Sequence, residues 1–272
     1  MKDLLRLFRE IITKRRLLLE LAKADFRKRF VGSYFGVVWM FVQPIVTVAI
    51  YYFVFGVGFR SGEPVAGVPY VLWLVAGIVP WFFFSEALNM GTNCLQEYSY
   101  LVKKVVFAVE LLPVIKMLSC AIVHGIFILI MCVLFLCFGW APKLFWLQIL
   151  YYSFATFMLD IALIFFTSAV QVFFKDMAQI VSICLQFGMW LTPIMWQVEQ
   201  FQGREVYPLL SRVIKFNPMY YIAAGYRDSM IFGAAFWERP MMTCYYWGLT
   251  LFLLLAGLKM FHRLRPHFSD VL

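Results

Sequence analysis

The stretch Val31-Gly-Ser-Tyr-Phe-Gly-Val-Val-Trp-Met-Phe-Val-Gln-Pro44 marks where this chain leaves water and enters lipid. It follows a basic, amphipathic segment and opens an uncharged run of 29 residues, from 31 to 59. A run of this length can cross a hydrocarbon core about 30 Å thick. Gly32 and Gly36, one helical turn apart, would let another helix approach closely, and Pro44 removes one backbone hydrogen bond within the run. These features predict a spanning helix that packs against others.

The composition excludes a soluble globule. Of the 272 residues, 63% are hydrophobic and 14% are charged, against about 25% charged residues in ordinary soluble domains. Several separate apolar runs are long enough to cross a bilayer, which predicts an all-α, polytopic membrane protein. The net charge of +9 does not indicate a nucleic-acid partner, because the basic residues cluster at the predicted membrane edges. The six cysteines lie almost all in apolar runs without a CxxC pair, which favours free thiols over disulfides or a metal site.

The N-terminal segment has the pattern of an amphipathic helix. Residues 4–30 carry apolar side chains at helical spacing with Lys and Arg between them. This pattern predicts a helix in the cytoplasmic membrane interface, with its apolar face in lipid or against the bundle. The order of regions that marks a cleaved signal peptide is missing, so we expect this segment to be retained.

Six membrane spans are predicted, with both termini in the cytoplasm. An even number of spans puts both ends on one side, and that side would hold sixteen Lys and Arg residues against seven on the other, with Lys116 inside a span. The positive-inside rule then assigns the richer side to the cytoplasm. The predicted spans are 34–59, 69–91, 113–140, 144–174, 177–198 and 241–259.

We expect one transmembrane domain over 1–272. Its parts would be an interface helix (1–30), spans one to five (31–198), an outer segment (199–240), span six (241–259) and a cytoplasmic tail (260–272). The outer segment alternates apolar patches with charges, and each patch is too short to span. This pattern predicts short re-entrant or interfacial helices that cap the outer mouth.

No constellation for catalysis is evident. The chain has three histidines, no HExxH and no GxSxG, and no glycine is followed by lysine, so the phosphate-binding P-loop is missing. We therefore expect neither a catalytic residue nor a metal site. Three ionisable residues interrupt the apolar runs, and a charge in the membrane is costly, so each is a candidate for function or pairing. Glu86 and Lys116 fall near predicted cytoplasmic ends, where they could pair or reach the interface. Asp160, nearest mid-span, could serve the pathway or a structural hydrogen bond.

Several motifs occur in an order that resembles the ABC-type permeases for lipid-linked polysaccharides, including O-antigen and teichoic acid exporters. Two positions depart from the pattern that this family shows, since Lys175-Asp176 replaces Arg-Asp and Thr192 replaces Ser. Lysine lacks the bidentate guanidinium of arginine. This substitution therefore bears on how an ATPase subunit would dock more than on whether the chain resembles this family. The matching stretches, spread over nearly the whole chain, are Gly32–Trp39 with Pro44, Ala76–Ser85, Leu101–Phe107 through Pro113, Phe174–Asp176, Leu191–Ile194, Phe216–Met219 with Tyr226-Arg227, and Phe261–Leu272.

The resemblance implies a bacterial inner-membrane homodimer that exports a lipid-linked polysaccharide. Each six-span subunit would dock a separate ATPase subunit, two copies in all, which would bind ATP and Mg, so this chain would need no cofactor. Membrane lipids would surround the dimer. The ATPase would touch the loop around Gln96–Leu101 and the turn before span five, through Gln96, Glu97, Tyr98, Lys175 and Asp176.

A polymer path must let sugars slide, which favours weak stacking on aromatic faces over fixed charge. Aromatic residues make up 19% of the chain, and many must simply face lipid. Beside the predicted helix distortions at Pro44 and Pro193, rings on spans one and five are candidates for the path, together with Asp160. The candidates are Trp39, Tyr51, Tyr52, Phe187 and Trp190 for the path, and Tyr220, Tyr221 and Tyr226 for an outer gate.

Two other functions fit parts of the sequence. An ABC permease for drugs or small hydrophobic molecules would share the architecture, whereas a membrane-embedded glycosyl- or acyltransferase would need acid or histidine clusters that the sequence lacks. The sequence leaves open the glycan, its lipid carrier and whether the ATPase recognises a modification of the chain end.

Overall fold

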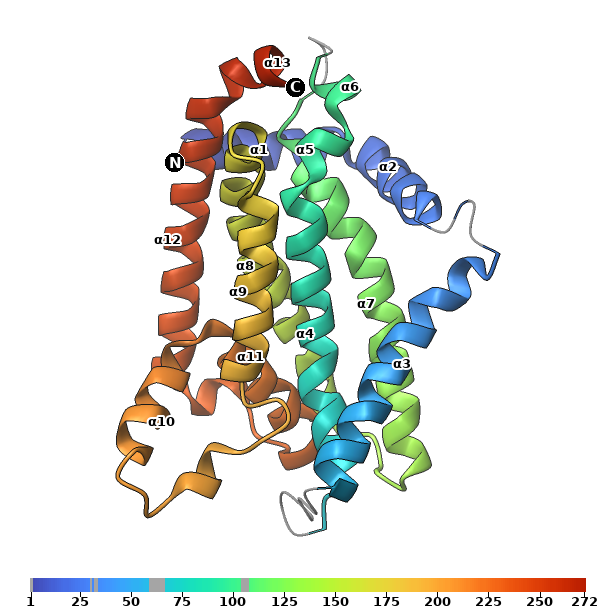
Figure 1. The fold of residues 1–272 in the computed structure, drawn as a ribbon, viewed down its shortest axis with the longest axis vertical. Coiled ribbons are helices and arrows are strands. Elements are labelled where there is room, and N and C mark those ends of the chain that lie inside the picture. Colours follow the sequence, from blue (N-terminus) through green and yellow to red (C-terminus); the bar gives the residue numbers. More distant parts are fainter. Residues whose placement is uncertain (1, 30, 32–33, 59–66, 104–107) are drawn as a thin grey trace.

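The computed structural model describes residues 2–29, 31, 34–58, 67–103 and 108–272, and these residues fold as helices and turns with no strand among them (Figure 1). Five helical segments in this described part are long and apolar enough to cross a membrane. The prediction of an all-α, polytopic membrane protein is confirmed. Gly32 and residues 104–107 of the Leu101–Phe107 motif lie outside the described residues.

The predicted interface helix consists of two helices, α1 (Lys2–Thr13) and α2 (Arg15–Lys28). The two helices are continuous through a bend at Lys14. The backbone amide of Lys14 donates to the carbonyl of Glu10, and the amide of Leu18 donates to the carbonyl of Lys14, as in an unbroken helix. Leu18 and Ala22 of α2 are buried, and α2 packs on α7. The apolar stripe of α2 therefore faces the bundle.

The spanning segments follow the predicted order. The first runs over Gly36–Gly58 and comprises η1 (Gly36–Val38), α3 (Trp39–Tyr51) and the π-helix η2 (Tyr52–Gly58). Gly36 begins it with φ +51, a conformation that favours glycine, and no other described residue apart from its chain neighbours lies within 4 Å of the place of a Cβ there. Gly36 thus serves the turn into the span, and among the described residues no other helix approaches it closely; Gly32, the other glycine of the predicted pair, lies outside them. The other four are α4 (Tyr70–Thr92), α7 (Leu111–Cys137), η3 (Leu144–Leu147) with α8 (Gln148–Phe173), and α12 (Pro240–Leu264), which continues through η7 (Arg265–His267) into α13 (Phe268–Val271).

The predicted span 177–198 is shorter as a helix. Helix α9 covers Met177–Leu191, 15 residues, or about 22 Å at 1.5 Å per residue. It ends because Pro193 disfavours helical torsions at Thr192, whose ψ is 125°. Figure 1 shows α9 running beside α4 and α8, both of which it contacts, from the end that holds α13 to the end that holds α10.

Short helices occupy the predicted outer segment. They are η4 (Val198–Phe201), α10 (Tyr207–Phe216), α11 (Pro218–Arg227), η5 (Asp228–Phe232) and η6 (Phe236–Glu238). The Asn217 side chain caps α11 by accepting from the amide of Met219, and Pro218 fits the first helical position. Most of α11 is buried, and it packs on α4 and α8.

Helix α4 is the centre of the bundle. In its most apolar window 78% of the residues are buried, against 6% for Gly36–Gly58. Helices α7, α8, α9 and α11 all contact α4, whereas α3 leans outward in Figure 1. The first span therefore leaves most of its apolar surface to lipid or to another chain.

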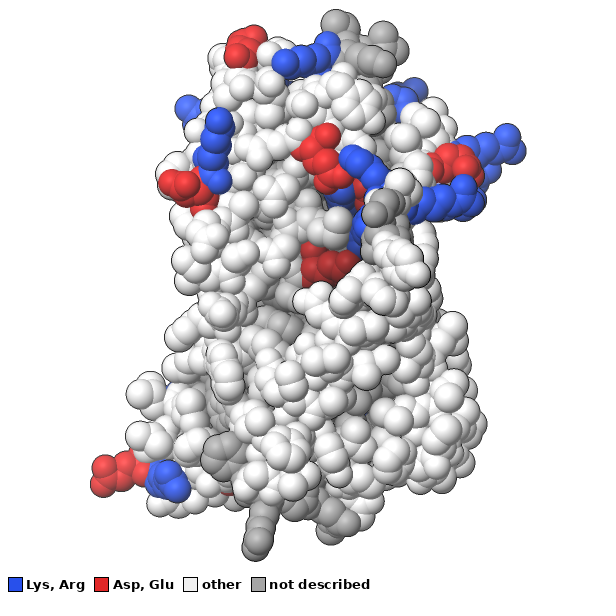
Figure 2. Space-filling model, turned by 45° about the vertical axis from the view of Figure 1, so that its right-hand side comes forward, with Lys and Arg blue, Asp and Glu red and all other residues white. Residues whose placement is uncertain are grey.

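The charged side chains mark one end of the molecule. Both termini lie at that end, together with α5 (Cys94–Glu97) and α6 (Ser99–Val102) (Figure 1). Figure 2 shows Lys, Arg, Asp and Glu gathered there, above a broad band almost free of charge. We call this the charged end and the opposite one, which holds α10 and α11, the outer end.

Candidate functional site

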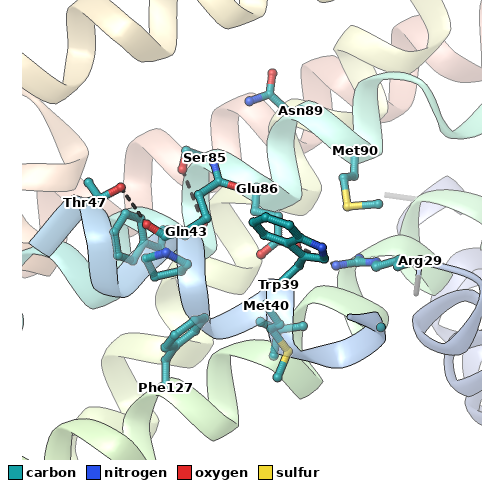
Figure 3. A pocket seen from close by; sticks show the side chains of 14 residues that line it. Arg29, Trp39, Met40, Gln43, Thr47, Ser85, Glu86, Asn89, Met90 and Phe127 are labelled. Carbon is teal, nitrogen blue, oxygen red and sulfur yellow. Dashed lines mark hydrogen bonds and ion pairs between the residues drawn. The ribbon is translucent and has the colours of Figure 1, made fainter. Parts of the chain in front are cut away.

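A groove of about 700 Å³ lies between α3 and α4, with α7 contributing Val123 and Phe127 (Figure 3). Trp39, Gln43 and Thr47 line it from α3. They are four residues apart, so helical geometry places them on one face. Helix α4 faces them with a set spaced by three or four residues, namely Phe82, Ser85, Glu86, Asn89 and Met90.

The groove combines neutral polar groups with aromatic rings. Gln43 and Asn89 contribute amides, and Asn89 accepts a hydrogen bond from Ser182 of α9 at 3.1 Å. The rings of Phe82 and Phe127 lie with their centroids 6.3 Å apart. The two charged side chains of the lining, Arg29 and Glu86, pair with each other, so the groove offers hydrogen bonds and flat apolar faces with its fixed charges neutralised, which suits a polyhydroxylated ligand.

The first spanning segment and helix α9 meet beyond the groove, towards the outer end. The hydroxyl of Tyr51 lies 3.7 Å from the sulfur of Met189, and the rings of Phe55 and Trp190 have centroids 6.5 Å apart. Tyr51 and Trp190, both predicted to line a path, therefore lie at one junction, where each contacts a residue of the other segment.

The other predicted path residues are spread over different places. Trp39 lines the groove and is 51% exposed, and Phe187 is exposed on α9. Tyr52 lines a separate cavity with Tyr70 and Leu134. Asp160 is fully buried in α8, and neither carboxylate oxygen has a hydrogen-bond partner within the described part of the chain. Asp160 does not line the groove.

Two of the three predicted gate tyrosines pack inside the subunit. The Tyr226 hydroxyl lies 2.6 Å from Ser153 and 2.9 Å from His124. The Tyr221 hydroxyl lies 3.0 Å from Tyr151, and both gate residues are buried. Tyr220 instead lines a cavity of about 330 Å³ at the outer end, together with Trp73 and Trp196.

The two elements predicted to touch an ATPase lie next to each other at the charged end. Gln171, near the end of α8, links the two elements, although no sequence motif predicted a role for it. Its amide donates to the Gln96 side chain at 3.3 Å, and its oxygen accepts from the backbone of Ala178, just after Lys175 and Asp176. Gln96 and Lys175 also line a common cavity of about 380 Å³. One surface therefore carries both predicted contacts.

Lys116 is the centre of an ion-pair cluster at the same end. Its ammonium lies 2.6 Å from Asp25 of α2 and 2.7 Å from Glu97 of α5, and its side chain is only 1% exposed. Tyr98 donates to Asp25 at 2.5 Å, and Lys28 pairs with Glu97 at 3.1 Å. The sequence pointed to Lys116 and Glu97, but it gave no reason to single out Asp25, because Asp25 lies in a helix rich in charge.

The cluster keeps its carboxylates ionised. Burial raises the pKa of Asp25, but the hydrogen bonds from Lys116 and Tyr98 outweigh it and leave this pKa below its ordinary value. Burial also raises the pKa of Glu97, and bonds from Lys116 and Lys28 lower it by more. Both carboxylates are therefore ionised at neutral pH, and as the pH falls the ion pairs weaken when acid protonates these two groups.

Arg29 connects the cluster to the groove. Its guanidinium lies 2.6 Å from Glu86 and 3.8 Å from Asp25. Both Arg29 and Glu86 line the groove, and Figure 3 shows Arg29 reaching into it from beyond the end of α3. Glu86 and Lys116, which the sequence left without roles, are thus both members of ion pairs that hold α2 against the bundle.

A second polar joint lies at the outer end. Arg227 is buried and donates to the carbonyls of Pro193 and Ile194, each at 2.7 Å, and its guanidinium stacks 3.8 Å from the Trp73 ring centre. The Asn217 amide donates to Thr192 at 2.8 Å. Threonine supplies the hydroxyl that serine would supply, so the Thr192 departure leaves this contact intact.

Comparison with known proteins gives consistent matches over most of the chain. The family model described as ABC-2 type transporter matches residues 16–231. An O-antigen export system permease protein RfbA of Klebsiella pneumoniae is 26% identical over 264 residues, which cover 94% of this chain and 95% of that protein. A protein of the same name from Myxococcus xanthus is 26% identical over 275 residues, covering 98% and 99%.

Proposed function

Because the chain belongs to the ABC-2 type transporter family, we propose that it is the membrane subunit of a polysaccharide exporter driven by a separate ATPase. The similar proteins are named as O-antigen export permeases, and the two matches cover 94% and 98% of this chain. The cargo would be a lipid-linked glycan.

The observation that carries the proposal is the lining of the groove. Neutral amides and hydroxyls of Gln43, Ser85 and Asn89 stand beside aromatic rings, a surface that suits sugar hydroxyls and sugar C–H faces. A permease for small hydrophobic molecules would bury the same amides against an apolar cargo at a cost. The groove therefore favours a glycan over a hydrophobic drug.

The proposed assembly is a homodimer with six crossings per subunit and both termini in the cytoplasm. Helix α9 would be the fifth crossing, completed by the turn and bends over residues 192–196. The exposed apolar surfaces of α3 and α9, two helices that meet at Tyr51 and Met189, would face the second subunit, so that two grooves form one path. The contact between Phe55 and Trp190 would close that path on the outer side.

Coupling would start at the charged end. Two copies of an ATPase would dock on Gln96, Glu97, Tyr98, Lys175 and Asp176, and their closure on ATP would move α5. The path would open because ATP favours one of two arrangements of these helices. Nucleotide and Mg would stay in the ATPase, and Tyr220 would remain a candidate for contact with an emerging sugar.

The test is export by a groove variant in cells that otherwise lack this chain. We expect cells without the chain to accumulate the lipid-linked polymer inside. Trp39→Leu with Gln43→Leu should lower export roughly fivefold, since losing a hydrogen bond costs about 1 kcal/mol. The complex should still assemble and hydrolyse ATP.

A matched control is Trp237→Leu, which removes a ring of similar exposure that lies outside the groove. Its export should equal that of the wild type. Normal export by the groove variant would show that the polymer path does not use this groove. If cells without the chain do not accumulate polymer, the proposal of polysaccharide export is refuted.

A further inference from the structure

We propose that Lys116 is a positioning residue that links the ATPase-contact helix α5 to the mouth of the groove, through Asp25 and Arg29 of the interface segment. The proposal rests on the proposed function and adds the atoms that carry the motion. It assigns a role to a buried lysine that a simple bundle would not need.

The first link joins α5 to α7. Glu97 is the last residue of α5, about one third of its side chain is exposed, and it faces the surface proposed to meet the ATPase. Towards the bundle, Glu97 pairs with Lys116, which lies in the second turn of α7 and is almost completely buried. A displacement of α5 therefore changes the environment of the Lys116 ammonium directly.

The second link joins Lys116 to the interface helix. The same ammonium lies 2.6 Å from Asp25, which is also 1% exposed. Tyr98, the next residue after Glu97, donates to that same carboxylate oxygen of Asp25. Two neighbouring residues of the contact loop thus converge on Asp25, one through Lys116 and one directly.

The third link reaches the groove. Arg29 is one helical turn beyond Asp25, and its guanidinium contacts Asp25 at 3.8 Å and Glu86 at 2.6 Å. Glu86 lines the groove from α4, beside Trp39 of α3. The ion pair of Arg29 with Glu86 holds the end of α2 at the mouth of the groove, where the chain turns into the first span.

The balance of charge supports a relay over a simple anchor. Three acids (Asp25, Glu86, Glu97) meet three bases (Lys28, Arg29, Lys116), so no charge is left over when partners change. Buried ion pairs add little to stability compared with apolar packing, so stability alone gives a weak reason to bury a lysine here. A lysine shared by two carboxylates can instead shift between them when one carboxylate moves.

The decisive variant is Asp25→Asn with Lys116→Met in the complex with the ATPase. It removes one acid and one base, and it leaves Glu97 paired with Lys28 and Arg29 paired with Glu86, so no buried charge is stranded. We expect assembly and ATP hydrolysis to persist, while polymer exported per ATP falls roughly fivefold or more, the low end of coupling between linked sites. Lys116→Arg, which keeps the charge, should retain most of the coupling.

The matched control is Lys23→Met, which removes a lysine from the exposed pair with Glu20 on the same interface helix. It should leave the ratio of export to hydrolysis unchanged. Normal coupling in the double variant would overturn the proposal, because it would show that the cluster serves folding only. Equal loss in the Lys23→Met control would also overturn it, since the effect would then follow from any lysine of this region.

A second measurement separates this proposal from the identity of the cargo. Spin labels at Val46 of α3 and Ile183 of α9, both exposed and outside the groove, report the distance between spans one and five. The distance should change with ATP in the wild-type complex and stay fixed in the double variant. An equal change in both would sink the relay, whereas a wild-type complex that moves but exports no glycan would refute only the proposed cargo.

Discussion

At the scale of single residues, the joint between Gly77 and Arg227 shows how the quoted motifs depend on one another. A Cβ on Gly77 would lie 2.7 Å from a guanidinium nitrogen of Arg227. Arg227 in turn bonds the carbonyls of Pro193 and Ile194 where α9 ends. Three motifs distant in sequence therefore meet at one buried guanidinium, which satisfies two backbone carbonyls of the turn that follows α9.

Gly77→Ala should destabilise the protein by about 1–3 kcal/mol, as overpacking of a closed site does. The guanidinium cannot move away cheaply, because two carbonyls and the Trp73 ring hold it. The measurement is the thermal midpoint of the purified protein in one detergent.

Gly125→Ala is the control for that variant. Gly125 also lies in a long apolar helix, but beyond its chain neighbours and the backbone of its own helix no described atom lies within 4 Å of the place of its Cβ. We expect its midpoint to match the wild type or exceed it slightly. Equal thermal midpoints for the two variants would contradict the close packing of Arg227 against Gly77.

At the scale of helices, the pair α8 and α12 depends on one close approach. A Cβ on Gly257 of α12 would lie 2.6 Å from the carbonyl oxygen of Ala162 in α8. Phe165 and Phe261 pack edge to face beside this crossing, with centroids 5.3 Å apart. Small residues allow such approaches between membrane helices, where dispersion contacts replace the hydrophobic effect.

Gly257→Ala should separate α12 from α8 and cost about 1–3 kcal/mol, because the backbone oxygen cannot rotate away. Cysteines placed across this crossing should then crosslink more slowly. The matched variant is Gly248→Ala on the same helix, where the added Cβ meets nothing within 4 Å. Unchanged crosslinking in Gly257→Ala would contradict the close approach.

At the scale of the whole molecule, the arrangement of the two ends leads to a topology test. Both termini and most charges lie at the charged end, and α10 lies at the outer end (Figures 1 and 2). We expect an impermeant thiol reagent, applied to intact cells, to label a cysteine at Arg204 but not one at Ser269. Both positions are exposed, so the membrane alone should cause the difference.

This labelling needs a background free of the exposed native cysteines Cys137, Cys184 and Cys244. Permeabilised cells provide the control, and there both positions should react. Labelling of Ser269 in intact cells would reverse the proposed orientation. Labelling of neither position in permeabilised cells would contradict the exposure that the structure gives.

The sequence was sufficient for the properties that depend on composition and local order. The class of protein, the helical N-terminal segment and five long apolar helices follow from apolar run length and helical spacing, because lipid forces each long run to satisfy its own backbone. Helix α9 ends earlier than the predicted span, because apolar character continues past Leu191 while Pro193 stops the helix.

The candidate site needed the tertiary structure. Trp39 and Gln96 were named from the sequence, but Gln43, Asn89, Asp25 and Gln171 carry no local signal. Asp25 looks like any charged residue of an amphipathic helix until folding places Lys116 and Tyr98, which are 91 and 73 residues away, against it. A buried ion pair depends on which helices meet and at what depth, and that follows from the packing of α2 on α7 rather than from the spacing of charges along one helix.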